Sequence, residues 1–130
     1  MPASRARHVI VAESVFTERS LIADVLRSDG LLVHEVEDGR TALDLARIIR
    51  PDLLVIASEI PALSGLEVLA KVRADRKLHR MPVVVLVEDD VEELILPALD
   101  AGASDVIAKP PSPLDLLERV TRALSEQTAA

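Results

Sequence analysis

The feature that most constrains the fold is an alternation of short aliphatic runs with longer stretches of helical period. Each run is rich in Val, Ile and Leu, and each is followed by a segment whose apolar residues recur with the spacing of one helix face. Such runs are typical of a parallel sheet that helices cover on both faces. We predict strands at residues 8–12, 32–36, 52–57, 82–87 and 104–108.

Strands joined in this way by right-handed crossovers favour a flavodoxin-like (βα)5 fold of the α/β class, a doubly wound parallel sheet with strand order 2-1-3-4-5. In this arrangement the functional crevice lies beyond the carboxyl ends of the first and third strands. The 130 residues of the chain are enough for a single domain. We expect a core over about residues 8–124 and a tail, 125–130, that frays or begins a linker.

Capping residues and apolar periodicity place the helices. Ser14 is the candidate N-cap of the first helix, and Ser112, followed by Pro113, is the candidate N-cap of the last. The second and third helices are predicted at about 39–49 and 64–74. The predicted buried faces consist of Leu21, Ile22, Val25 and Leu26; Ala42, Leu45, Ala46 and Ile49; Leu66, Leu69 and Val72; and Leu117, Val120, Thr121 and Leu124.

The segment before the fifth strand departs from a regular helix. Pro97 in a helix body would remove one backbone hydrogen bond, at a cost of roughly 3 kcal/mol. The helix therefore either kinks or begins late, with Pro97 near its first turn. In both cases Leu94, Ile95 and Leu96 can be partly exposed as a contact surface, although they could equally pack into the core.

Charge and composition exclude several functions. The 15 Lys and Arg against 22 Asp and Glu give a net charge of -7, which opposes binding to nucleic acid and to anionic membranes. The absence of cysteine excludes disulfides and thiolate chemistry, and it fits a cytoplasmic location. The longest apolar runs are far shorter than the roughly 20 residues of a membrane span. Phe16 is the only Phe, Tyr or Trp, so no platform for base stacking is present.

Three stretches together resemble the response-regulator receiver domains, the CheY-like family. The family's third strand and the turn after it are similar to DLLVIASEIPALSGLEVL, in which Pro61 and Gly65 match. Its second helix is similar to EDGRTALDLA. Its fifth strand and Lys-Pro pair are similar to AGASDVIAKP, which ends in Lys109 and Pro110. The resemblance covers residues 8–124 and implies the fold predicted above.

At the crevice the sequence departs from this family. The resemblance implies an aspartate at the end of the third strand that accepts a phosphoryl group, and this position is Ala57, which has no nucleophile. It implies two acidic Mg²⁺ ligands after the first strand, where the chain has Ala12 and Glu13. The family's hydroxyl on the fourth strand and its aromatic switch residue on the fifth are replaced by Val87 and Val106.

The pocket lysine and its proline, Lys109 and Pro110, are retained. In the family this lysine pairs with the aspartate, and that partner is missing here. A lysine at the end of a buried strand is costly without a counter-charge. We predict that Lys109 turns to Glu13, and less favourably to Glu59 or Glu88.

Other chemistry on these residues is less well supported. Glu13 and Glu59 are too few carboxylates for a hard cation, so no metal site is expected. Ser58 follows the substituted position, but it points to the other strand face and has no activating base. A flavin or nucleotide needs a Gly- or hydroxyl-rich loop after the first strand, where the chain has AESVFTE. The histidines, expected at the surface in separate segments, are His8, His34 and His79.

The sequence therefore predicts a pseudo-receiver: a phosphorylation-independent protein-interaction module of bacterial signal transduction, not an enzyme, with no cofactor. By resemblance, its partner is a foreign protein or a second copy that contacts the fourth helix, fifth strand and fifth helix, with residues 94–97 as candidates. The alternative is a sensor that binds a small ligand or ion in the remnant of the crevice. An apolar plug at Ala57 would favour the first hypothesis, and a solvated pocket beside Lys109 the second.

Overall fold

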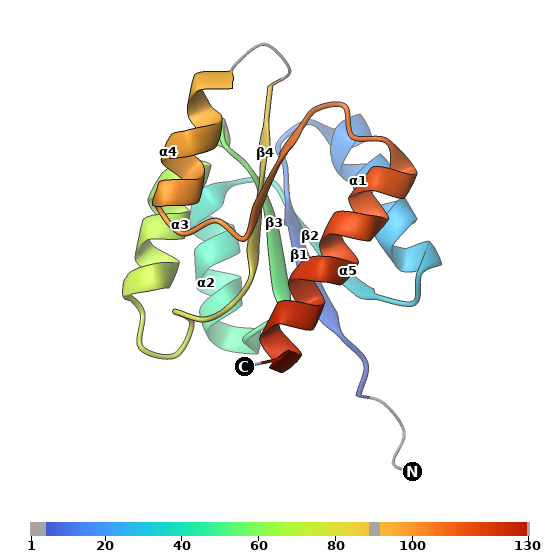
Figure 1. Cartoon of the computed structure of the whole chain (residues 1–130), viewed down its shortest axis with the longest axis horizontal. Helices are drawn as coiled ribbons and strands as arrows, with labels where there is room; N and C mark the ends of the chain where they lie inside the picture. The colour runs from blue at the N-terminus through green and yellow to red at the C-terminus, as the bar shows by residue number, and fades with distance from the viewer. Residues whose placement is uncertain (1–4, 89–91, 130) are drawn as a thin grey trace.

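The computed structural model describes residues 5–88 and 92–129, which form a parallel sheet between two layers of helices (Figure 1). In chain order the elements are β1 (His8–Ala12), α1 (Phe16–Ser28), β2 (Leu32–Val36), α2 (Gly39–Ile49), β3 (Leu53–Ala57), α3 (Gly65–Ala74), β4 (Val83–Val87), the 3-10 helix η1 (Glu92–Leu94), α4 (Ile95–Asp100), β5 (Asp105–Ala108) and α5 (Pro113–Ala129). The strands pair in the order β2-β1-β3-β4-β5, which confirms the predicted flavodoxin-like topology.

The sheet separates two apolar cores. Leu54 and Ile56 of β3 belong to the core under α2 and α3, whereas Leu53 and Val55 belong to the core under α1 and α5. Figure 1 shows these two helix layers on opposite sides of the sheet. Every residue of β3 and β4 is buried, which explains why these strands are continuous aliphatic runs instead of alternating ones.

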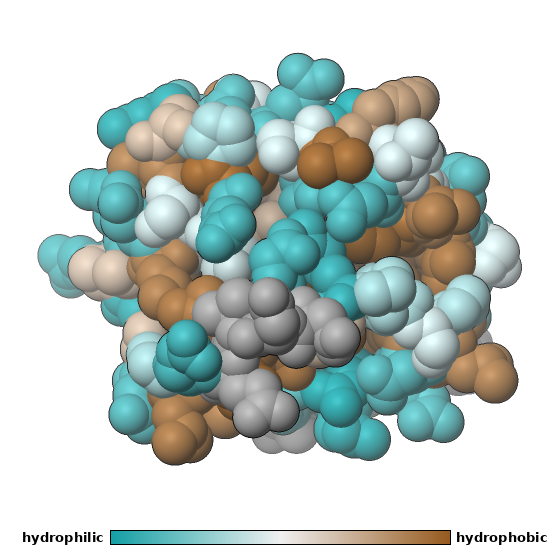
Figure 2. Space-filling model, turned by 90° about the horizontal axis from the view of Figure 1, so that it is seen from above, coloured by the Kyte–Doolittle hydropathy of each residue, from teal (hydrophilic) through white to brown (hydrophobic). Residues whose placement is uncertain are grey.

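The parallel register aligns the carboxyl ends of the strands at one edge of the sheet. Ala12 pairs with Ile56, and Val87 pairs with Ala108. Because all the strands run the same way, the loops that follow β1, β3, β4 and β5 meet at this edge. Figure 2 looks down on this side of the molecule, where hydrophilic residues lie near the middle and a mixture of hydrophilic and apolar residues surrounds them.

Several predicted boundaries hold, and the differences have local causes. The predicted bounds of β1, β2 and α2 are confirmed, while β3, β4 and β5 each begin one residue later than predicted. The N-cap of α1 is Val15, without a side-chain cap bond, so the prediction that Ser14 caps this helix is wrong. α5 continues to residue 129, so the helix extends over most of the segment predicted as a frayed tail or the start of a linker.

Two predicted core residues lie on the wrong face of their helices. Leu21 is 68% exposed, and Thr121 is exposed as well. Each of these residues is next in sequence to a buried residue. The buried helix face was therefore predicted one residue too wide, and it included them. The buried faces are instead formed by Arg19, Ile22, Ala23 and Leu26 in α1 and by Leu116, Val120, Ala123 and Leu124 in α5.

The proline in α4 has the effect predicted for a late helix start. α4 begins at Ile95, so Pro97 lies in its first turn, where the missing N–H has no intrahelical acceptor to lose. Leu96 is 71% exposed, whereas Leu94 and Ile95 pack partly against the core. The expectation of partial exposure at this segment is therefore confirmed.

Ser112→Ala is expected to lower the free energy of unfolding by about 1 kcal/mol. The Ser112 hydroxyl accepts the backbone N–H of Asp115 at 3.1 Å and so caps α5. Ser14→Ala is the matched control and should change stability by less than about 0.5 kcal/mol, because Ser14 is exposed and does not cap α1. Urea denaturation followed by circular dichroism measures both, and equal losses would contradict the assignment of the caps.

Candidate functional site

A buried ion pair joins the ends of β1 and β5. Lys109 Nζ lies 2.9 Å from Glu13 Oε1, and the two side chains are 8% and 1% exposed. The backbone holds both residues, because the Glu13 N–H donates to Val36 O and the Lys109 N–H donates to Val87 O. The predicted contact between Lys109 and Glu13 is confirmed.

Two further carboxylates surround the same ammonium group. Lys109 Nζ is 3.3 Å from Glu88 Oε1 and 3.7 Å from Glu18 Oε1. Glu88 was the weaker predicted partner, and Glu18 was missed, although its place in the first turn of α1 carries it to the same edge as Glu13. The remaining predicted partner, Glu59, is exposed and forms no ion pair with Lys109 in the structure. The cluster thus carries more negative than positive charge.

This imbalance affects both members of the buried pair. Burial raises the pKa of Glu13, and the neighbouring Glu18 raises it further, while Lys109 opposes the shift. Burial works to lower the pKa of Lys109, but the hydrogen bond to Glu13 and the charges of Glu13 and Glu18 outweigh it and raise that pKa. Both groups therefore hold their protons more tightly than they do in water.

One atom of the cluster is left without a partner. Within the part of the chain that the structure describes, Glu13 Oε2 is buried and makes no hydrogen bond. A buried polar atom without a partner costs about 1–3 kcal/mol. The unpaired oxygen agrees with the raised pKa of Glu13, because protonation would lower the cost of burying it.

The substituted crevice positions are parts of the apolar core. Ala12, Ala57, Val87 and Val106 all belong to the cluster under α2 and α3, and none is more than 8% exposed. Backbone packs closely behind them, since a Cβ added at Gly65 would lie 2.5 Å from the carbonyl oxygen of Ala57. The floor of the crevice is therefore an aliphatic plug.

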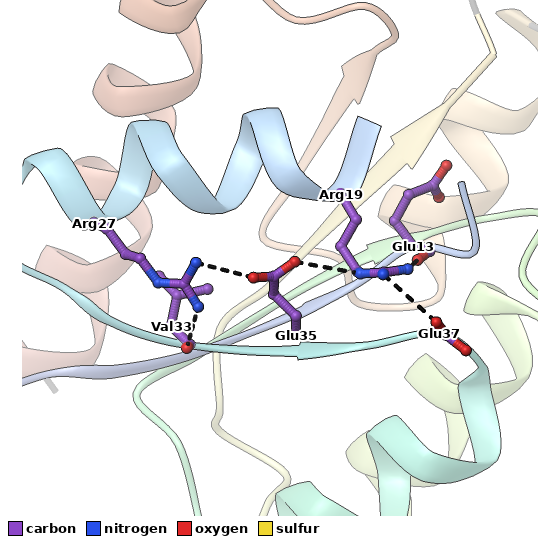
Figure 3. Close-up of polar contacts among 6 residues, drawn as sticks. All are labelled: Glu13, Arg19, Arg27, Val33, Glu35 and Glu37. Atoms are coloured by element: carbon purple, nitrogen blue, oxygen red, sulfur yellow. Dashed lines mark hydrogen bonds and ion pairs between the residues drawn. The ribbon is translucent and has the colours of Figure 1, made fainter. Parts of the chain in front are cut away.

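Arg19 supports the site from α1 and was missed by the sequence analysis. Its Nη1 donates to the carbonyl oxygen of Glu13 at 2.9 Å, and the residue is only 8% exposed (Figure 3). The same guanidinium pairs with Glu35 at 3.3 Å and with Glu37 at 3.5 Å on the β2 side. Figure 3 shows Arg27 extending this network along α1 to Glu35. The helical spacing of α1 did not indicate a role for Arg19. An arginine is not expected on the buried face of a helix unless its partners are known.

Two histidines form a contact that their separation in sequence did not predict. His8 Nδ1 and His34 Nε2 lie 2.9 Å apart, and the two rings stack with centroids 5.2 Å apart. The predicted surface location therefore holds for His79, which is exposed, and only in part for His8 and His34, which are half-buried. Burial, His8 and Arg27 lower the pKa of His34. The pair lies near the start of β1, away from the carboxyl edge.

An apolar groove borders the ion cluster. It has a volume of about 190 Å³ and lies between α1 and the segment that leads from β5 into α5. Leu21, Ile22 and Val25 line one side and Pro110 and Pro113 line the other, with the charged Glu18 and Lys109 at one end. Its shape suits an apolar group more than an ion.

Comparison with known proteins gives the family. Residues 9–121 match the family model described as the response regulator receiver domain. The chain is 33% identical to the two-component response regulator ORR11 of Oryza sativa subsp. indica over 119 residues, which is 90% of this chain and 80% of that protein. It is 32% identical to the transcriptional regulatory protein PdtaR of Mycobacterium tuberculosis over 120 residues, 92% of this chain and 57% of PdtaR.

A solved structure agrees with these matches. The receiver domain of the sensor histidine kinase PA1611 from Pseudomonas aeruginosa, which has a magnesium ion coordinated in its active site cleft, matches with a TM-score of 0.84 and 25% identity. The match covers 93% of this chain and 99% of that one. The chain therefore belongs to the response regulator receiver domain family, whose members act in two-component signalling. In residues 5–88 and 92–129 no helix is long and apolar enough to cross a membrane.

Removing the lysine of the ion pair should destabilise the fold in a pH-dependent way. Lys109→Met leaves Glu13 buried without its counter-charge, so we expect a loss of about 3 kcal/mol at about pH 7.5. The folded-state pKa of Glu13 would then lie further above its unfolded value. The penalty is therefore full above the folded pKa and disappears as the pH falls below the unfolded value. Guanidinium denaturation at a series of pH values measures it.

The double variant Glu13→Gln/Lys109→Met is the control for this experiment. It removes both charges and should lie within about 1.5 kcal/mol of the wild type at every pH. A Lys109→Met loss that does not depend on pH would mean that packing of the lysine stem, not the charge of Glu13, causes the effect.

Proposed function

We propose that this receiver domain is a pseudo-receiver, which acts by protein contact without accepting a phosphoryl group. The observation that carries the proposal is the aliphatic plug: Ala57 ends β3 at the crevice, with Ala12 and Val87 beside it in one apolar core. An acyl phosphate requires a carboxylate oxygen to attack phosphorus, and a methyl group cannot do so. Lys109 is already engaged by Glu13 and Glu88.

The residues at the crevice do not fit a receiver's magnesium ion. Mg²⁺ needs an octahedral set of oxygen ligands, usually with carboxylates among them. In the described part of the chain no group of three or more acidic or histidine side chains is arranged to hold a metal. Glu13 offers a carboxylate, but one of its oxygens binds Lys109.

The proposed contact face consists of α4, β5 and α5. Leu96 and Leu99 of α4 are 71% and 41% exposed, and Leu114 of α5 is 77% exposed. Leu96 and Leu99 lie three positions apart on one helix, and neighbouring exposed leucines are typical of a contact surface for another protein. Because the aromatic switch residue is replaced by Val106, contact at this face would not depend on phosphorylation at the crevice.

A second candidate is a sensor that binds a small ligand or ion beside Lys109. The specific observations in its favour are the unpartnered Glu13 Oε2 and the apolar groove that ends at Lys109. Against it stands the plug formed by Ala57 and Val87, which leaves the floor of the crevice apolar.

Rebuilding the crevice tests the proposal. The wild type and Ala57→Asp should incorporate no phosphate from acetyl phosphate, because Ala12 and Val87 still offer neither metal ligand nor hydroxyl. Ala12→Asp/Ala57→Asp/Val87→Thr should become labelled in a Mg²⁺-dependent reaction, measured by intact mass. Ala12→Asp/Ala57→Asn/Val87→Thr is the matched control, which should stay unlabelled. Rapid labelling of Ala57→Asp alone would refute this account of the crevice.

The same proteins distinguish the two candidates in an amide NMR titration with Mg²⁺ and beryllofluoride, a phosphoryl mimic. We expect no shifts at Glu13, Ala57 and Lys109 in the wild type and saturable shifts in the rebuilt variant. Saturable shifts in the wild type would favour the sensor.

Photo-crosslinking tests the contact face. A photoreactive leucine analogue at Leu96 should give a discrete protein adduct in cells, whereas the same analogue at Ile48 on α2 should not. The two positions are a matched pair, since they are 71% and 78% exposed. The Leu96 adduct should persist in the Ala57→Asp background. Equal adducts at both positions would argue against a specific face.

A further inference from the structure

Charge is distributed unevenly between the two edges of the sheet. The strands β1, β3 and β4 are each preceded by an arginine, and most strands are followed by a carboxylate. The preceding residues are Arg7, Arg50 and Arg80. The following residues are Glu13 after β1, Glu37 after β2, Glu59 after β3 and Glu88 after β4. Parallel strands place the first set at the amino edge and the second at the carboxyl edge.

The basic edge is concentrated where α2 and α3 end. Arg47, Lys71, Arg76 and Lys77 line one open hollow of about 510 Å³ between these helix ends. The hollow contains a single carboxylate, Asp75, which pairs with Arg47 at 3.4 Å. The remaining cations of this basic end are exposed and form no ion pair within the described residues. They are Arg50, Lys71, Arg76, Lys77 and Arg80.

Helix dipoles explain only part of this basic end. A cation in the last turn of a helix offsets the partial negative charge of the free carbonyl groups, by about 0.3–1 kcal/mol. Arg47 and Lys71 lie in such last turns. Arg76, Lys77 and Arg80 lie beyond α3, in the segment that leads to β4, and the dipole effect falls off within the last turn. The helix dipole therefore does not account for these three cations.

The carboxylates at the carboxyl edge are too far from the cations at the amino edge of the same molecule to neutralise them. A strand of five residues spans about 16 Å, which is about two Debye lengths at physiological ionic strength. The two edges therefore present separate fields to an approaching molecule, although the net charge of the chain is -7. Exposed carboxylates at the carboxyl edge include Glu37, Glu59 and Glu93.

We propose that the basic end of one copy, formed by Arg50, Lys71, Arg76, Lys77 and Arg80, docks on the acidic carboxyl edge of a second copy. The chain supplies both complementary surfaces itself, and no Phe, Tyr or Trp lies at the basic end to stack on a nucleic-acid base. The contact is head-to-tail, so it does not close by two-fold symmetry and can extend to further copies. Exposed charge pairs are worth about 0.2–1 kcal/mol each, so the association is weak and sensitive to salt.

Sedimentation velocity of the whole chain tests this surface. At about 20 mM salt the wild type should show concentration-dependent association, which should weaken at least about tenfold at about 500 mM. Arg76→Glu/Lys77→Glu and Glu59→Lys/Glu93→Lys should each stay monomeric alone, because each reverses two charges on one of the two docking surfaces and so removes most of the attraction between them. A mixture of the two variants should associate again, since their edges are complementary.

A charge-matched control separates the surface from the total charge. Arg122→Glu makes the same change in net charge as Arg76→Glu, but it lies on α5, outside both docking surfaces, and should associate like the wild type, whereas Arg76→Glu should associate more weakly. Any of three results would overturn the proposal: a wild type that is monomeric in all conditions, association that survives Arg76→Glu/Lys77→Glu, or mixed variants that stay monomeric. A monomeric wild type that binds a DNA oligonucleotide through Arg76 and Lys77 would instead assign the basic end to a polyanion.

Discussion

The parallel hydrogen-bond ladder is the constraint on which the rest of the structure depends. It fixes the register of β1, β3, β4 and β5, and with it the single edge at which their following loops meet. Glu13 and Lys109 come from opposite ends of the chain, yet they lie 2.9 Å apart because the ladder ends both strands at the same height. The distribution of charge between the two edges follows from the same alignment.

The crevice combines two environments that are normally in conflict. Its floor is aliphatic and continuous with the core under α2 and α3, while its rim holds an ammonium among carboxylates. A low-dielectric floor strengthens the attraction between the paired charges and also raises the cost of an unpaired atom such as Glu13 Oε2. The raised pKa of Glu13 reflects this cost of burial. Arg19 donates a hydrogen bond to the backbone carbonyl of Glu13 and so holds the residue in place.

The fold could be predicted from the sequence because the patterns that indicate it are local and recur along the chain. Aliphatic runs, helix stops and the late start at Pro97 each follow from neighbouring residues. The partnership of Lys109 with Glu13 was predictable because a buried charge restricts its partners strongly. The contacts that the sequence analysis missed depend on tertiary geometry. Glu18 and Arg19 reach the site through the rotation of α1, and the contact of His8 with His34 depends on the diagonal register of β1 and β2, which single-sequence periodicity does not contain.

The ion pair also has a consequence for the time course of folding. Its two residues are separated by 96 positions, and β5 is the last strand of the sheet in chain order. A contact between residues so far apart in sequence forms only after a loop of most of the chain has closed. The conformational entropy of that loop is therefore lost before the contact stabilises the fold. The ion pair between Glu13 and Lys109 can therefore form only after β5 has docked on β4. During synthesis from the ribosome, a chain that ends before residue 109 already contains the acidic rim but not the cation that balances it. Formation of the pair thus requires that β5, the last strand, has already joined the sheet.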